Sequence, residues 1–219
     1  MRILCVSDIV DRYLYNSDES RNINPDLIVS CGDLPRDYLE FLMSKFNVPL
    51  FFVQGNHDNY FPEVSLCGLH RSKFDFTSQH DYTKCFAGVN IDGKLVTFRG
   101  VTFVGFEGCN RYSDGPHQYT QEEMKMKVRK VYWKLFLRKT IFNLGVDVIV
   151  THAPPYGIHD NTDIVHTGFK AFIDIMERFK PKYLIHGHTH IYDIRESKVS
   201  DYKGTKVINC YGYYVLDLP

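Results

Sequence analysis

Short apolar runs that end in a polar side chain of the Asp, Asn or His type are the strongest constraint in this chain. Five segments show this pattern, and they read ILCVSD, LIVSCGD, FFVQGNHD, VIVTHAPP and YLIHGHTH. Runs of this length, rich in Val, Ile, Leu and Phe and stopped by Gly, Asp, Asn or Pro, are typical of buried β-strands. Loops at the carboxyl ends of strands in an open α/β sheet converge on one crevice. We therefore expect the five segment ends to meet.

The order of the apolar runs predicts an α/β fold. Strands are expected at Ile3–Val6, Leu27–Ser30, Leu50–Val53, Val101–Val104, Val146–Val150, Tyr183–Ile185, Lys206–Ile208 and Tyr213–Leu216. Helical patterns fall between them, at Tyr38–Phe46, Glu122–Phe142 and Phe169–Phe179. Long connections between the early strands favour parallel pairing, whereas the last three strands follow one another closely and are expected to be antiparallel. A mixed sheet, or two packed sheets flanked by helices, follows.

Length and charge narrow the class of protein. A chain of 219 residues can bury a sizeable core, and we expect a single domain over 1–219 with an irregular lid or insert at about 59–120. Lys plus Arg and Asp plus Glu number 26 each, so no global field attracts nucleic acid or an anionic membrane. The basic stretch Lys125–Lys139 is interrupted by apolar residues as on an amphipathic helix, and a solvated face explains it best.

The cysteines indicate a reducing compartment. They are scattered singly, without a C-x-x-C pair, at Cys5, Cys31, Cys67, Cys85, Cys109 and Cys210. Buried free thiols fit this pattern, since a secreted chain would tend to oxidise them. The chain also shows no signal peptide and no apolar run of about 18 residues, the length that crosses a bilayer. We expect a cytoplasmic protein without a membrane partner.

The polar residues at the strand ends favour a metal site. They are Asp8, Asp33, Asn56, His57, Asp58, His152, His188 and His190. Taken singly, an Asp could cap a helix, an Asn could form a turn and a His could be a core residue. Their joint occurrence at five strand ends favours a metal site. Oxygen and imidazole ligands without thiolate suit Mn, Fe, Zn, Co or Ni rather than Ca. One carboxylate can bridge two cations, and we expect Asp33 to do so.

The order of the motifs resembles the calcineurin-like metallophosphoesterase superfamily. The likeness rests on Ser7-Asp8, Gly32-Asp33, the GNHD of 55–58, Thr151-His152 and the GHTH of 187–190. It implies a four-layer α/β/β/α sandwich and two divalent or trivalent transition-metal ions, Mn or Fe before Zn, Ni or Co. By this resemblance the first ion takes Asp8, Asp33 and His190. The second ion takes Asp33, Asn56, His152 and His188.

The resemblance also implies catalytic roles for His57 and Asp58. His57 would face the substrate, where it stabilises charge on the phosphate or protonates the leaving oxygen, and Asp58 would orient its imidazole. One position departs from the pattern, because the family usually shows D-x-H at the first strand and this chain has Val10. Asp11, Asp58 or water would have to fill that position of the first site, or the first ion binds weakly.

Substrate contacts are harder to predict from the sequence. His70 precedes a basic segment, and Arg111 follows a turn at a strand end, where an Arg can bind phosphate with both of its terminal nitrogens. Tyr112, Tyr119 and Tyr156 could stack on an aromatic group or pack beneath a lid. His70 and Arg111 are the first candidates for substrate contacts, and the alternative is that His70 is a loop residue and Arg111 a solvated surface residue.

The expected function is hydrolysis of a phosphate mono- or diester of a small molecule by attack of a metal-bound hydroxide. The alternative is a catalytically impaired protein of the same fold that acts as a binding scaffold, as the retromer subunit of the superfamily illustrates. A nuclease ranks below both, because the chain lacks the basic balance that a phosphate backbone demands.

Overall fold

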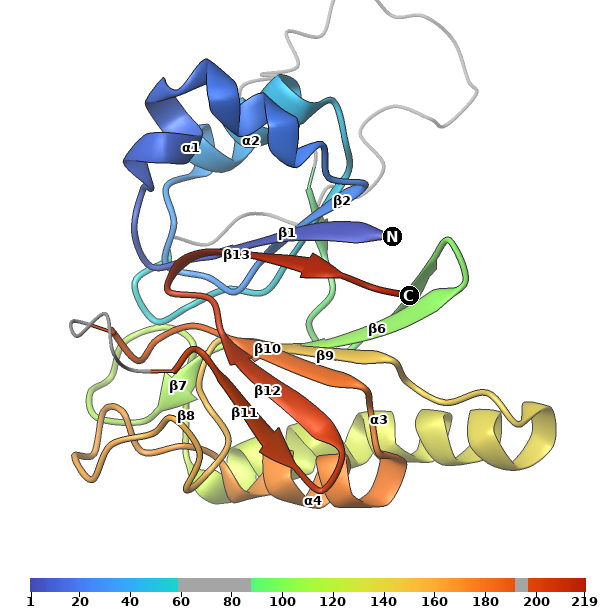
Figure 1. The fold of residues 1–219 in the computed structure, drawn as a ribbon. Coiled ribbons are helices and arrows are strands. Elements are labelled where there is room, and N and C mark those ends of the chain that lie inside the picture. The colour runs from blue at the N-terminus through green and yellow to red at the C-terminus, as the bar shows by residue number, and fades with distance from the viewer. Residues whose placement is uncertain (59–87, 192–196) are drawn as a thin grey trace, which may run out of the picture.

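The computed structural model describes residues 1–58, 88–191 and 197–219, and it shows two β-sheets packed face to face with helices outside each (Figure 1). The first sheet has the strand order β13-β1-β2-β3-β4. Its strands are β13 (Gly212–Asp217), β1 (Arg2–Ser7), β2 (Leu27–Ser30), β3 (Leu50–Phe52) and β4 (Val89–Asn90). β1 to β4 are parallel, and β13 runs antiparallel to β1.

The second sheet has the strand order β11-β12-β10-β9-β6-β5. Its strands are β11 (Val199–Tyr202), β12 (Thr205–Asn209), β10 (Tyr183–His186), β9 (Val148–Thr151), β6 (Val101–Phe106) and β5 (Leu95–Phe98). The four central strands are parallel, and the two edge strands are antiparallel to their neighbours. A short pair, β7 (Cys109–Asn110) and β8 (Gln118–Tyr119), lies outside both sheets.

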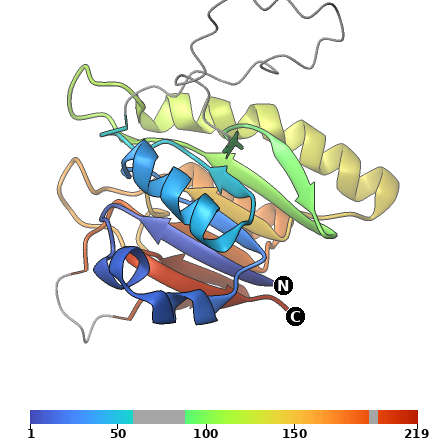
Figure 2. The same cartoon turned by 90° about the horizontal axis from the view of Figure 1, so that it is seen from above.

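The helices form the outer layers. α1 (Arg12–Asn16), the 3-10 helix η1 (Asp18–Ile23) and α2 (Arg36–Phe46) cover the first sheet, while α3 (Gln121–Phe142) and α4 (Lys170–Phe179) cover the second (Figures 1 and 2). α3 begins at a capping box in which Thr120 and Glu123 each accept the other's backbone N–H. The structure confirms the predicted four-layer sandwich.

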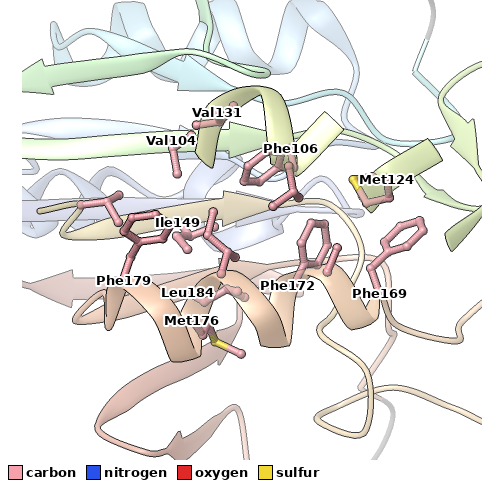
Figure 3. Close-up of a cluster of buried hydrophobic side chains, with 14 of the residues drawn as sticks. Val104, Phe106, Met124, Val131, Ile149, Phe169, Phe172, Met176, Phe179 and Leu184 are labelled. Atoms are coloured by element: carbon pink, nitrogen blue, oxygen red, sulfur yellow. The ribbon is translucent and has the colours of Figure 1, made fainter. Parts of the chain in front are cut away.

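Successive side chains of each central strand point to opposite faces of its sheet, and this produces three layers of hydrophobic core. Ile3 and Cys5 of β1 point between the sheets, while Leu4 and Val6 point toward the helices α1 and α2. In β9, Val148 and Val150 face the first sheet, whereas Ile149 packs beneath α3 and α4 with Phe172 and Phe179 (Figure 3). Both faces of the central strands are therefore covered, which is why their sequences are continuous apolar runs.

The expectation for the last three strands was wrong. β12 pairs parallel with β10, and the closing strand β13 leaves that sheet and pairs antiparallel with β1 in the other. The cause is β11, a strand that the sequence reading missed because its four residues, VSDY, carry little apolar signal. The hairpin β11–β12 reverses the chain, so that β12 runs in the same direction as β10.

The described part of the region 59–120 is more regular than expected. From residue 89 onward it supplies β4 to the first sheet, β5 and β6 to the second, and the pair β7–β8. Residues 59–87 lie outside the described residues. No helix in the described part of the chain is long and apolar enough to span a membrane. Cys5, Cys31, Cys109 and Cys210 are buried free thiols.

Candidate metal centre

Three of the predicted ligands lie in a backbone conformation that residues other than glycine rarely adopt. Asp8 follows β1 with φ 68°, Asp33 follows β2 with φ 57°, and His188 follows β10 with φ 65°. This left-handed conformation costs a residue with a side chain roughly 1–2 kcal/mol. Its repetition at three strand ends, drawn from both sheets, marks the place where the backbone is bent to direct side chains into a shared site.

The side chains of Asp33, His152 and His188 form the centre of the site. Their ligand atoms all lie within 4.8 Å of one another. The Nε2 atom of His152 lies 3.4 Å from Asp33 Oδ2 and 3.0 Å from Asn56 Oδ1. The structure therefore brings together the four residues that the resemblance assigns to the second ion.

Backbone carbonyls fix which nitrogen each histidine presents. His152 Nδ1 lies 2.7 Å from the carbonyl oxygen of Cys31, to which it donates, so Nε2 faces Asp33. His188 Nε2 lies 2.9 Å from the carbonyl oxygen of Val165, and the same argument leaves Nδ1 for the site. Such bonds hold an imidazole ring in the orientation that a metal ligand requires. The sequence could not predict these two contacts, because every residue has a backbone carbonyl.

Asp8 and His190 form a second, looser part of the site. The Asp8 carboxylate is buried and accepts the backbone N–H of His188 at 3.1 and 3.0 Å through its two oxygens. His190 Nε2 lies 4.0 Å from Asp8 Oδ1, and the His190 ring packs against Tyr211 with centroids 4.7 Å apart. Two members of the ligand set expected for the first ion, Asp8 and His190, therefore lie close together, and their role as ligands with Asp33 stays a prediction.

The position that lacks a histidine is not filled by a neighbouring carboxylate in the structure. Val10 is 41% exposed. Asp11 is the N-cap of α1, where its Oδ1 accepts the backbone N–H groups of Tyr13 and Leu14. Asp58 Oδ2 accepts the backbone N–H groups of Gly55 and Asp33. The sequence left Asp11, Asp58 and water as candidates for this position. Both carboxylates instead accept hydrogen bonds from backbone N–H groups.

His57 and Asp58 lie beside the centre. His57 is exposed, and its backbone N–H donates to Asp33 Oδ1 at 2.8 Å. Asp58 is buried, and its contacts hold the loop that carries Asn56 against the loop that carries Asp33. That role differs from the orientation of the His57 imidazole that the resemblance implied, and the catalytic roles of both residues stay predictions.

Arg111, one of the two predicted substrate contacts, is bonded to other residues of the protein. The guanidinium of Arg111 donates to the Glu123 carboxylate at 2.9 and 3.1 Å and to the carbonyl of Gln118, beside the start of α3. Its neighbour Tyr112 reaches the centre instead, because its hydroxyl accepts the side-chain N–H of Asn56 at 3.1 Å. His70 lies outside the described residues. Contact of His70 and Arg111 with a substrate therefore stays a prediction.

A second pair of histidines supports the GHTH turn, and sequence reasoning missed its role. Buried His186 donates from Nδ1 to the carbonyl of Gly187 at 2.9 Å, so its Nε2 is the acceptor for His159 Nδ1 at 3.0 Å. His159 Nε2 in turn lies 2.8 Å from Ser200 Oγ. The i,i+2 spacing of His186 and His188 along the chain was the available signal.

The charges of the centre fit a cation. Burial opposes the charged form of His152, but the carboxylates of Asp33 and Asp8 outweigh it and raise the His152 pKa to about 9. Burial likewise opposes the charged form of Asp33, but the charge of His152 and its hydrogen bond lower the Asp33 pKa to about 2. A transition-metal ion at this place would take over the position of the proton on His152 Nε2. Nitrogen and oxygen atoms that can bind a metal converge there, and the remaining ring nitrogens of His152 and His188 are hydrogen-bonded to backbone carbonyls. The residues therefore fit such an ion.

Comparison with known proteins agrees with this geometry. A sequence model of the calcineurin-like phosphoesterase family matches residues 1–192. An uncharacterised protein of Methanocaldococcus jannaschii is 32% identical over 127 residues, covering 55% of this chain and 52% of that protein. A UPF0046 protein of Caenorhabditis elegans is 24% identical over 204 residues, covering 87% of this chain and 63% of that protein. The chain thus spans between half and two thirds of the length of these relatives.

Solved structures show the same fold. A protein of Thermus thermophilus superposes with a TM-score of 0.55 at 12% identity, covering 96% of this chain and 89% of that one. GAP50 of Plasmodium superposes with a TM-score of 0.53 at 14% identity, covering 96% of this chain and 71% of that one. The family match spans most of the chain and confirms the expected family. The chain belongs to the calcineurin-like phosphoesterase family.

Proposed function

We propose that this protein hydrolyses a phosphate ester of a small molecule with the help of two transition-metal ions, Mn or Fe in preference to Zn, Ni or Co. The observation that carries the proposal is the convergence of Asp33, His152 and His188, whose ligand atoms lie within 4.8 Å of one another. The two imidazoles are already oriented by backbone carbonyls, so ligand binding requires little rearrangement.

The proposed ligands divide unevenly between the two ions. Asp33, Asn56, His152 and His188 would hold the second ion, and Asp8, Asp33 and His190 would hold the first. When bound, a pair of cations lowers the pKa of water and offsets the charge of the phosphate oxygens. The first ion has fewer protein ligands, because Val10 offers none and Asp11 caps α1. We therefore expect the first ion to exchange more readily than the second.

His57 is the proposed proton donor. Its backbone N–H is fixed on Asp33 Oδ1, which places an exposed imidazole next to the shared carboxylate. Hydrolysis breaks a P–O bond: water supplies oxygen to phosphorus, and the alcohol leaves with a proton. A histidine can deliver that proton near neutral pH. Asp58 supports this step by holding the loops of residues 33 and 55 together.

The test compares metal content with hydrolysis in the same samples. The protein is stripped of metal, reloaded with Mn or Fe, and assayed by elemental analysis and with aryl phosphate mono- and diesters. We expect at least one equivalent of bound metal and hydrolysis of one ester class. His152→Ala should remove both, while His57→Ala should keep the metal and lower kcat by about 10²–10⁴-fold. Full metal occupancy without hydrolysis of either ester would refute the proposal.

The second candidate function is a binding scaffold, and the exposed Val10 favours it, because the first-strand histidine is replaced by a side chain that cannot bind metal. A site that has lost its function would be expected to lose several ligands together, whereas the others here remain in place. The same elemental analysis separates the two candidates. Less than one equivalent of metal after loading with Mn or Fe would favour the scaffold.

A further inference from the structure

Helix α3 carries a second apolar face on the side turned away from the protein. Its buried face packs against the second sheet and α4, and consists of Met124, Val128, Val131 and Leu135. Four other apolar side chains of the helix are more than half exposed, and we call them the outer stripe: Met126, Trp133, Leu137 and Ile141. At about 3.6 residues per turn, Leu137 lies about 200° around the helix from Leu135, and the other three share its side. The outer stripe is therefore opposite the core.

The exposed apolar surface continues at the C-terminal end of α3. This end of the helix extends past the ends of the strands (Figures 1 and 2). Phe142 follows Leu135 by seven residues and so continues the row of the buried face, yet Phe142 is 66% exposed, and Leu144 beyond the helix is exposed as well. Single apolar side chains are common on protein surfaces, but neighbours at a spacing of four residues form a contiguous patch, which marks an interaction site.

The same segment is strongly basic. Residues 124–146 hold seven Lys or Arg residues and no Asp or Glu. Lys127 turns inward to Glu107 and Asp92, and Arg138 donates to Thr102 Oγ1 at 3.0 Å. The other five are exposed and form no ion pair with any residue that the structure describes: Lys125, Arg129, Lys130, Lys134 and Lys139. The equal totals of acidic and basic residues in the whole chain thus hide a local excess of positive charge.

The combination of charge and apolar surface indicates the kind of partner. Arg129 is four residues before Trp133, and Lys134 is three residues before Leu137, so basic side chains border the outer stripe. A second copy of the chain on this face would bring like charges together. An anionic lipid surface offers the opposite charge and an apolar interior. Helices with Trp, Leu and Phe beside Lys and Arg lie in the interface of such bilayers, where long basic side chains reach the headgroups.

We propose that the outer stripe and the C-terminal end of α3 bind the surface of an anionic membrane. The expectation of a protein without a membrane partner rested on the net charge and on apolar runs too short to cross a bilayer, and binding at the surface requires neither a net positive chain nor a spanning segment. β9 follows α3, and its far end carries His152. The C-terminal end of α3 therefore lies at the opposite end of β9 from the candidate metal centre.

The test uses the fluorescence of Trp133, the single tryptophan of the chain. The protein is titrated with vesicles of phosphatidylcholine that contain about 30% phosphatidylserine, and with vesicles of phosphatidylcholine alone. We expect the anionic vesicles to move the emission maximum to shorter wavelength, because the exposed indole ring would leave water for the interface, and to carry the protein down on centrifugation. Affinity for phosphatidylcholine alone should be at least about tenfold lower, and added salt should weaken binding to the anionic vesicles.

Two pairs of variants locate the contact. Leu137→Glu places a negative charge in the outer stripe and should lower vesicle affinity at least about tenfold, whereas Ile164→Glu makes the same change at an exposed residue between β9 and α4 and should leave it unchanged. Lys134→Gln should lower affinity for the anionic vesicles about fivefold, and Arg12→Gln, on α1 at the other sheet, should not. Circular dichroism checks that each variant is folded.

The outcomes that would overturn the proposal are distinct. Trp133 emission that shifts with neither kind of vesicle would refute membrane binding, and equal affinity for both kinds would refute the anionic surface. Full affinity in Leu137→Glu would place the contact outside the outer stripe. A shift that grows with protein concentration in the absence of vesicles, together with a dimer in light scattering, would assign the face to a second copy. None of these measurements requires bound metal, so the membrane proposal and the phosphoesterase proposal stand or fall separately.

Discussion

The hydroxyl of Tyr112 accepts a hydrogen bond from the side-chain amide of Asn56 at 3.1 Å. With Nδ2 turned to Tyr112, the amide oxygen Oδ1 points the other way and lies 3.0 Å from His152 Nε2. An amide that rotated by half a turn would present N–H groups to the metal centre, which a cation cannot use. Tyr112 thus holds the Asn56 amide in the orientation that turns its oxygen, a proposed metal ligand, toward the centre.

We predict that Tyr112→Phe weakens metal binding while the fold stays intact. Loss of an outer partner of a metal ligand typically costs about 10–100-fold in affinity. Competition with a fluorescent chelator for Mn measures the change. Tyr156→Phe is the matched control, because Tyr156 is also exposed and lies beside Lys170 rather than Asn56. Equal Mn affinity in both variants would show that Tyr112 does not orient the amide.

A side chain at residue 187 should disrupt the site. A Cβ atom there would overlap Ser7 Oγ and approach Asp8 Oδ2 to 2.6 Å, so Gly187 permits the close approach of β10 to the end of β1. We predict that Gly187→Ala lowers Mn affinity at least tenfold and lowers stability by about 1–3 kcal/mol, the usual cost of overpacking. Mn titration and urea unfolding measure the two effects.

Gly145→Ala provides the comparison for that variant. A Cβ atom at residue 145 meets nothing within 4 Å, so stability and Mn affinity should both stay near those of the unmodified protein. If Gly187→Ala behaved like Gly145→Ala, the two strand ends would have to tolerate displacement, and the tight packing inferred for the site would be wrong.

The ends of the strands could be predicted from the sequence because the side chains proposed as metal ligands are themselves the signal. Asp8, Asp33 and His188 follow apolar runs whose burial is evident from composition alone. The direction of β12 could not be predicted, since it depends on the hairpin with β11, whose alternation is too polar to stand out.

The contacts that orient the proposed ligands could not be predicted from the sequence either. The carbonyls of Cys31 and Val165 orient the two histidines, but any residue would supply a carbonyl at those positions. At 111–112 the sequence pointed to Arg111, because guanidinium suits phosphate, whereas the structure places Tyr112 against Asn56. Which of two neighbouring side chains faces a site depends on the local backbone, here the pairing of β7 with β8.

A buried ionic cluster behind the site should make stability depend on pH. Lys127 Nζ lies 2.9 Å from both Glu107 Oε1 and Asp92 Oδ2, and Tyr119 donates its hydroxyl to Glu107 at 2.6 Å. Burial alone would raise the Glu107 pKa, but a hydrogen bond from His117 and the charge of Lys127 lower it to about 2 from 4.5. The ionised carboxylate therefore stabilises the folded state above pH 4.5, and this contribution is lost as pH falls toward 2.

We predict that Glu107→Gln lowers the free energy of unfolding by about 3 kcal/mol at pH 7, from the size of that pKa shift. The difference from the unmodified protein should stay constant down to pH 4.5 and shrink below it. Urea unfolding at pH 7, 4.5 and 3 measures it. Glu122→Gln, an exposed residue in the first turn of α3, should change little at any pH. A difference that grew on acidification would contradict the assigned direction.

The final prediction concerns the position where the first strand departs from the family pattern. Val10 is exposed and Asp11 caps α1, so the proposed first ion depends on Asp8, Asp33 and His190. We expect Mn titration to resolve a tight and a weak class of site, and Val10→His to tighten the weak class by about tenfold, or about 1.4 kcal/mol. Val89→His, another exposed valine, should leave both classes unchanged. If Val10→His altered neither class, side chains at residue 10 would not reach the first ion, and its weakness would need another cause.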